Sequence, residues 1–194
     1  MKTASVMFLV ICTLLWLGIS AEFIQRDVTF QSNSLTLKDS LGYIYLSLTS
    51  CSDIKLTDAI GKPIVPIKTI SILVPSDAEN TEISYQAIKS ETIHIENIPF
   101  PTQPPKLTLE TEDIFIVPDS SVYSSGELYP ENNGKMANIS EKNGWKVVKS
   151  DVYPIQYIMA DSLLIFIESI SYSVSYLRDG SITETCQGSC VKMD

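Results

Sequence analysis

Histidine is almost absent from this chain: among 194 residues, His94 is the single one. Histidine is the usual general base near neutral pH and a common metal ligand, so its scarcity restricts the available chemistry. A Gly-rich phosphate loop, a GxSxG nucleophile motif and an HExxH zinc motif are missing as well. His94 shares one side of a predicted strand with Thr92 and Glu96, between Ile93 and Ile95, which predicts a solvent-facing residue. We expect no catalytic residue, no cofactor and no metal site.

Positive charge is also scarce. The chain has 14 Lys and Arg against 23 Asp and Glu, giving a formal net charge of −9. Nucleic-acid binding needs clustered cations that displace counterions, so this class of partner is excluded. With 44% hydrophobic and 19% charged residues, the chain is predicted to fold, and its length suits one domain.

A long apolar run occurs only at the N-terminus. Lys2 is the single charged residue before Glu22, and it precedes the apolar run Val6–Leu17 and the small residues around Gly18–Ala21. This pattern is typical of a signal peptide, residues 1–20, cleaved after Ser20 or Ala21. The alternative is an uncleaved anchor, although the run is shorter than the ~20 residues that span a bilayer. We expect a protein that is secreted or in the cell envelope and that meets a membrane only during export.

Few cysteines remain after such cleavage, namely Cys51, Cys186 and Cys190. An odd number allows one intramolecular disulfide plus a free thiol, or an intermolecular link. The spacing CQGSC is compatible with a disulfide between Cys186 and Cys190, and a long-range pairing stays open. Catalysis by a cysteine nucleophile would require the fold to bring His94 close to one of these thiols.

Helical periodicity is lacking beyond the N-terminal run. Short runs of alternating apolar and polar residues, separated by Gly, Pro and Asn turns, predict an all-β fold: a single antiparallel β-sandwich or an open barrel. The segment 145–176 is predicted to be a long hairpin that turns near Met159–Ser162. Its second strand alternates serines with Ile170, Tyr172, Val174 and Tyr176. Pro154 predicts an edge position or a bulge in its first strand, near the break in alternation at 149–151.

Two polar segments are of interest for function. The stretch from Asp119 to Asn143 has no clear period and is predicted to be a long surface loop that contains a glycosylation sequon at Asn138. Glu110, Glu112 and Asp113 form an acidic cluster, for which a solvated turn is favoured over a calcium site because no regular Asp/Asn/Gly loop is present.

Several stretches together suggest a family. The chain resembles the propeptide domain of gingipain-type cysteine peptidases in five successive stretches. They are GKPIVP at 61–66, KTISILVPSDAE, VYSSGELYPENNGK, GWKVVKSDVYPIQY and DSLLIFIESISYSVSY. The resemblance covers residues 25–177 and is most specific at Tyr129-Pro130 and Val152–Tyr157. It divides the chain into a signal peptide, 1–20, a propeptide-like β domain, 25–177, and a C-terminal tail, 178–194, with the CQGSC motif.

The resemblance implies a secreted prodomain that helps a peptidase to fold and keeps it latent, with a basic side chain from one loop in the pocket of the enzyme. In this chain the corresponding loop would be Ser120–Lys142, with Lys135 and Lys142 as candidates. Arg178, placed just beyond the last strand, would be a processing point or simply a surface arginine in a tail. Relatives continue into a catalytic domain, whereas this sequence stops at Asp194. The peptidase partner would therefore act in trans or would have been lost by truncation.

A different class of function remains open. The same β domain would also serve as a binding or structural module of the cell surface with no peptidase partner. An enzyme is the weakest alternative, because neither His94 nor any cysteine lies in a catalytic motif.

Overall fold

The computed structural model describes residues 19–49, 53–105 and 114–179 of the chain. Regular structure in these ranges is almost entirely β-strand, so the predicted all-β class is confirmed. The strands are β1 (Ile19–Thr29), β2 (Leu35–Ser40), β3 (Tyr43–Leu48), β4 (Ile54–Leu56), β5 (Pro66–Pro75), β6 (Glu79–His94), β7 (Ile98–Pro99), β8 (Leu128–Tyr129), β9 (Gly134–Lys142), β10 (Trp145–Val152), β11 (Ile155–Ile158) and β12 (Leu163–Asp179). A 3-10 turn, η1 (Ser32–Ser34), and one short helix, α2 (Ser120–Tyr123), complete the elements.

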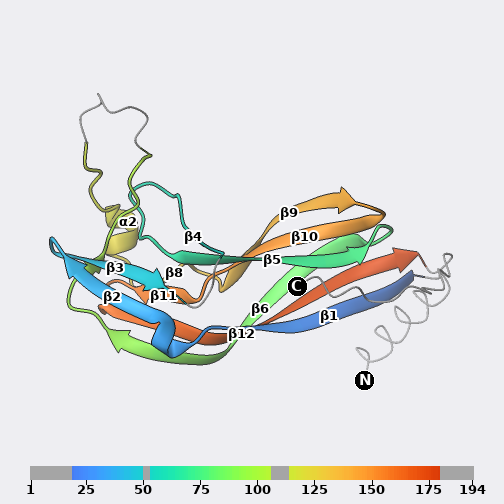
Figure 1. The fold of residues 1–194 in the computed structure, drawn as a ribbon, viewed down its shortest axis with the longest axis horizontal. Helices are drawn as coiled ribbons and strands as arrows, with labels where there is room; N and C mark the ends of the chain where they lie inside the picture. Colours follow the sequence, from blue (N-terminus) through green and yellow to red (C-terminus); the bar gives the residue numbers. More distant parts are fainter. Residues whose placement is uncertain (1–18, 50–52, 106–113, 180–194) are drawn as a thin grey trace, which may run out of the picture.

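The strands form three sheets. The main sheet has the order β1-β12-β11-β8, with β6 paired to β12 as well; the second sheet has the order β4-β5-β10-β9; the small sheet has the order β2-β3-β7. All pairs are antiparallel except β3 with β7. Figure 1 shows an elongated molecule in which the second sheet lies over one half of the main sheet. The small sheet and α2 belong to the other half.

The long strand β12 organises the main sheet. It pairs with β6 on one side and with β1 and β11 on the other, so that Val174 lies between Ile24 of β1 and Ile83 of β6. Pairing on both sides satisfies the backbone of a strand that is buried for most of its length. The alternation predicted for this strand holds on its inner face, where Ile170, Val174 and Tyr176 are buried.

Two hydrophobic clusters make up the core, one in each half of the molecule. The smaller cluster lies between the second sheet and the main sheet and consists of Ile72, Val74, Ala78, Val148, Val174 and Tyr176. The larger cluster spans the half with the small sheet and includes Phe30, Ile44, Val65, Tyr157, Phe166 and Ile170. Because β12 contributes to both clusters, it joins the two halves through its side chains as well as its backbone.

The predicted hairpin 145–176 is only partly correct. β11 and β12 form a hairpin whose turn is closed by the Ser162 amide donating to the Met159 carbonyl at 3.1 Å, as predicted. β10, however, pairs with β5 and β9 in the second sheet, so the chain changes sheets at Tyr153-Pro154. Proline has no amide hydrogen with which to continue a ladder, which explains the break at this position. A bulge lies between Lys149 and Ser150, where the alternation fails.

The predicted loop Ser120–Lys142 is also wrong in its second part. The structure places α2 at Ser120–Tyr123 and the strand β9 at Gly134–Lys142. β9 is an edge strand, exposed along nearly its whole length. An edge strand with little burial on either face has no reason to alternate apolar and polar residues, so the sequence resembles a loop.

The ends of the β domain lie close to the predicted bounds. β1 begins at Ile19 and β12 ends at Asp179, a little outside the predicted range 25–177. Residues 1–18 and 180–194 lie outside the described residues, whereas Ile19 and Ser20, the last two residues of the predicted signal peptide, belong to β1. The signal peptide and the CQGSC tail stay predictions. Within the described ranges, no helix has both the length and the apolar character needed to cross a bilayer.

We predict that Val174→Ala lowers the free energy of unfolding by about 2 kcal/mol, because the lost methyl groups leave a cavity in the smaller cluster. Val174 is fully buried, whereas the neighbouring Ser175 is exposed. Ser175→Ala is therefore the matched control and should change stability by less than about 0.5 kcal/mol. Urea denaturation of both variants gives the comparison, and equal midpoints would show that β12 does not contribute to the core as described.

Candidate functional site

The side chain of Gln103 joins two distant points of the chain. Its Nε2 donates to the carbonyls of Pro101 and Ile116 at 3.0 and 2.9 Å, and its Oε1 accepts from the Ile116 amide at 2.8 Å. The amide group thus pairs with the backbone of Ile116 in the same way as a neighbouring strand would. As a result, Gln103 and Ile116 are held side by side.

Backbone hydrogen bonds fix the surroundings of this contact. Gly61 donates to the carbonyl of Thr102 and accepts from the amide of Asp119, both at 2.9 Å. Asp119 also caps α2, since its carboxylate accepts from the hydroxyl and the amide of Ser121 at 2.7 and 3.0 Å. These bonds lower the pKa of the Asp119 carboxyl. Gly61 has a φ of 78°, a conformation that strongly favours glycine, so the turn at this point depends on it.

Four aromatic rings pack beside the Gln103 contact. Phe100 stacks on Tyr45 with centroids 4.6 Å apart and meets the edge of Tyr43 at 5.5 Å. Phe115, one residue before the clamped Ile116, lies 5.9 Å from Tyr43 and 6.0 Å from Phe100. Below them, the hydroxyl of Tyr123 donates to the Pro99 carbonyl at 2.8 Å. Burial raises the pKa of Tyr123, so this phenol stays protonated and remains a donor.

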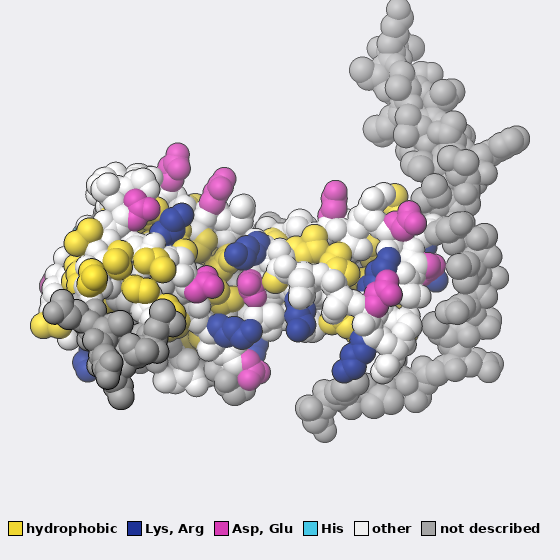
Figure 2. Space-filling view, turned by 90° about the horizontal axis from the view of Figure 1, so that it is seen from above, with side chains coloured by type: hydrophobic (Ala, Val, Ile, Leu, Met, Phe, Trp, Pro, Cys, Tyr) yellow, Lys and Arg dark blue, Asp and Glu magenta, His cyan; other side chains and the backbone are white. Residues whose placement is uncertain are grey.

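Apolar side chains around these rings reach the solvent. Ile114 and Val117 are 75% and 70% exposed, Ile60 is 53% exposed and Phe115 is 47% exposed. We call these four residues, with the Gln103 contact at their base, the apolar end. Figure 2 shows hydrophobic side chains gathered on one half of the molecule. We therefore take the apolar end as the candidate contact surface of the described residues.

A second hollow surrounds Lys135. It has a volume of about 350 Å³ and lies between β4, the loop after it, β8 and β9, with Tyr129 and Tyr153 in its lining. Burial raises the pKa of Tyr153, and the Lys135 ammonium beside it opposes this shift. Lys55, Asp58 and Asp151 also line the hollow, so its charges are mixed. Lys135 thus lies on a strand, beside the other side chains that line this hollow, and not on a projecting loop.

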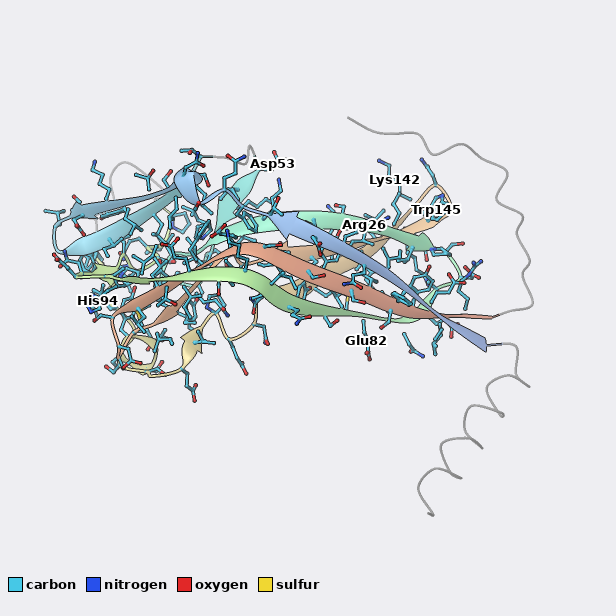
Figure 3. The ribbon with its side chains drawn as sticks, turned by 90° about the horizontal axis from the view of Figure 1, so that it is seen from below. Arg26, Asp53, Glu82, His94, Lys142 and Trp145 are labelled. Carbon is cyan, nitrogen blue, oxygen red and sulfur yellow. The ribbon has the colours of Figure 1, made fainter. Side chains whose placement is uncertain are left out.

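The other predicted residues on the strands are scattered. Lys142 lies at the tip of the β9–β10 turn, beside Trp145 and away from α2 (Figures 1 and 3). Asn138 is exposed on β9, opposite Lys149 of β10, so its side chain is accessible. His94 is exposed at the end of β6, as predicted, and faces Leu163 across the ladder.

Arg178 differs from its predicted position. It lies within β12, paired with Ser20 of β1, and is not beyond the last strand. Its guanidinium contacts the carboxylates of Asp77 at 3.0 Å and Glu22 at 3.7 Å, and Asp77 raises the pKa of this already strong base. Glu22 in turn accepts from the hydroxyl of Tyr176 at 2.9 Å. Cleavage after Arg178 stays a prediction and would first require these contacts to open.

The remaining candidates cannot be placed. Cys51, Cys186, Cys190 and the acidic cluster at Glu110–Asp113 lie outside the described residues. Among the residues that are described, no group of three or more His, Cys, Asp or Glu is arranged to hold a metal ion.

Sequence reasoning missed the Gln103 contact and the apolar end. Gln103 is a single amide within the proline-rich run PFPTQPP, and the run IFIV at 114–117 has the composition of a strand. Proline nitrogens cannot donate hydrogen bonds, so a polar side chain within a proline-rich run is the group that can bond the backbone of another segment. Such a residue is a usable signal in the sequence.

Comparison with solved structures identifies the fold. The chain matches a chain of the complex of the RgpB pro- and mature domains from Porphyromonas gingivalis, with a TM-score of 0.63 and 16% identity over 86% of this chain and 87% of that one. It also matches a structure that describes the zymogenic latency of gingipain K from Porphyromonas gingivalis, with a TM-score of 0.56 and 15% identity over 81% of this chain and 98% of that one. No protein-family model and no curated protein matches the sequence. The chain has a gingipain propeptide-like fold, as its residues suggested.

We predict that Gln103→Ala increases amide hydrogen exchange at Ile116 about tenfold, because the amide loses a partner in a bond worth about 1 kcal/mol or more. Gln103→Glu is the matched control, since a carboxylate still accepts from the Ile116 amide and should preserve part of the protection. Unchanged exchange at Ile116 in Gln103→Ala would show that the contact does not hold the segment.

Proposed function

We propose that this protein keeps a gingipain-type cysteine peptidase latent and assists its folding. The observation that carries the proposal is the likeness of nearly the whole chain to the two solved structures. One is a complex of pro- and mature domains, and the other concerns zymogenic latency. The peptidase belongs to another chain or to a longer precursor. In either case, the activity of the present protein is binding and not catalysis.

The apolar end is the surface that we assign to the peptidase. Exposed apolar and aromatic residues such as Phe115 and Val117 supply contact area, and aromatic rings are frequent anchors in interfaces. The Gln103 contact keeps the ends of the segment 104–115 together before binding. A segment with both ends fixed loses less conformational entropy when it binds, so more of the contact energy appears as affinity.

For the basic residue that enters the peptidase pocket, we add a further candidate to Lys135 and Lys142. Lys135 and Tyr153 line the same hollow, and Lys142 lies at the end of β9, in the half of the molecule away from α2. Between Gln103 and Ile116 the sequence has one basic residue, Lys106. Lys106 lies outside the described residues, so only its place in the sequence enters the proposal. We assign to Lys106 the role of entering the peptidase pocket.

The location of the protein follows the sequence pattern. The N-terminal run of apolar residues behind Lys2 supports export, with the mature protein secreted or held in the cell envelope. This location agrees with a partner that is itself a secreted peptidase. N-terminal sequencing of the protein from its native source tests the export signal.

We predict that the mature chain, added in excess to a gingipain-type peptidase from the same source, forms a stable complex and slows hydrolysis of a peptide substrate. Lys106→Ala should weaken inhibition by about thirtyfold, the effect of losing an interface residue worth about 2 kcal/mol. Lys142→Ala is the control, because it removes the same charge at the opposite end of the molecule and should leave inhibition unchanged.

Two results would contradict the proposal. No complex and no slowing would reject latency, and a pull-down from envelope extracts that recovered only polysaccharide or surface-layer protein would favour a cell-surface module instead. Loss of inhibition in Lys142→Ala, with Lys106→Ala unaffected, would move the contact from the apolar end to the β9–β10 turn.

A further inference from the structure

The second sheet ends in a free edge. Within the described residues, β9 pairs with β10 on one side and with no strand on the other. An edge of this kind presents unpaired amide and carbonyl groups that can accept another strand. Natural edges are often protected by charges, and β9 has Lys135, Glu141 and Lys142 along its length.

Two apolar residues of β9 point to the inside of the sandwich and yet remain exposed. The bulge opposite Lys149 and Ser150 shifts the register, so that Met136 faces Ser150 and Ile139 faces Val148. Ser150 and Val148 are fully buried, which places Met136 and Ile139 on the inner face of the sheet. Met136 and Ile139 are nevertheless 40% and 46% exposed, because within the described residues no strand pairs with the free edge of β9.

A groove runs beside these residues. It has a volume of about 420 Å³ and lies between β6 and the beginning of β9, with Ile83, Tyr85 and Met136 in its lining. On one side it is closed by Tyr85, whose hydroxyl bonds the Ser150 hydroxyl at 2.6 Å and whose ring lies against Gly134. Beyond this contact, no strand other than β10 pairs with β9 among the described residues.

β12 ends close to the far end of this edge. Arg178 lines a hollow of about 270 Å³ together with Asn143, Gly144 and Trp145, which form the β9–β10 turn. Figure 1 shows the C-terminal ends of β9 and β12 at the same end of the molecule. The contact of Arg178 with Asp77 fixes this exit point. A segment that turns back here runs antiparallel to β9.

We propose that residues 180–194 turn back after β12 and pair as an antiparallel strand with the free edge of β9, covering Met136 and Ile139. An extended segment of this length spans up to about 50 Å, whereas the 9 residues of β9 occupy only about 30 Å. The segment contains no proline, so every amide in it can donate to a ladder. Ile182, Thr183 and Thr185 favour strand conformation, and Ile182 and Val191 supply apolar side chains.

Hydrogen exchange measured by mass spectrometry tests this pairing in the full chain. The comparison is with a variant in which residues 181–194 are replaced by a Gly/Ser sequence of equal length. We expect peptides covering β9 to exchange about tenfold faster in the variant, because the outward amides lose their partners. Peptides covering β1, whose free edge lies on the other side of the molecule, are the internal control. Equal exchange in β9 would overturn the proposal.

A second pair of variants separates the tail from other occupants. Met136→Lys places a charge on the inner face and should remove protection from residues 181–194, whereas Asn138→Lys, on the outer face, should not. The melting temperature of each variant checks folding. Protection of β9 that rises with protein concentration and accompanies a dimer on gel filtration would assign the edge to a second copy, which overturns the proposal.

Discussion

Strand pairing along β12 is the constraint on which the rest of the structure depends. Its 17 residues pair with β6 on one side and with β1 and β11 on the other. Its inner face supplies Ile170 to the larger hydrophobic cluster and Val174 to the smaller one. The backbone of such a strand is satisfied only if all three neighbours are present. The two halves of the molecule are therefore held by one element, although each has its own core.

The position of β10 shows what a sequence pattern can and cannot predict. Period-two alternation identified the strands on both sides of Pro154, and the proline itself predicted a disruption of the ladder. Which sheet each strand joins depends on partners such as β5 and β9, which lie far away in the sequence. β9 was missed for a related reason. Apolar and polar residues alternate in a strand when one face is buried. The residues of β9 are exposed on both faces, so its sequence shows no alternation.

Contacts that position the candidate site were hidden for the same physical reason. Gln103 acts on the backbone of Ile116, and a backbone partner has no sequence signature of its own. The pairing of Arg178 with Asp77 and Glu22 likewise joins the end of β12 to the β5–β6 turn and to β1. The sequence pattern predicted Arg178 to be a tail residue, because its partners Asp77 and Glu22 lie far away in the sequence. The family resemblance supplied the fold, and only the three-dimensional contacts supplied the surface.

The two ends of the molecule carry different kinds of residues, so substitutions at one end need not affect the contacts at the other. At one end, the side chains of Ile114, Phe115 and Val117 are exposed next to the hydrogen bonds between Gln103 and Ile116. At the other end, the ion pairs of Arg178 and the free edge of β9 lie beside the smaller cluster. Changes at sites with no shared partners add nearly independently. Residues at the apolar end can therefore change without loss of the fold, while β12 and its neighbours keep the scaffold. A scaffold of this kind fits chains with 15–16% identity and the same architecture.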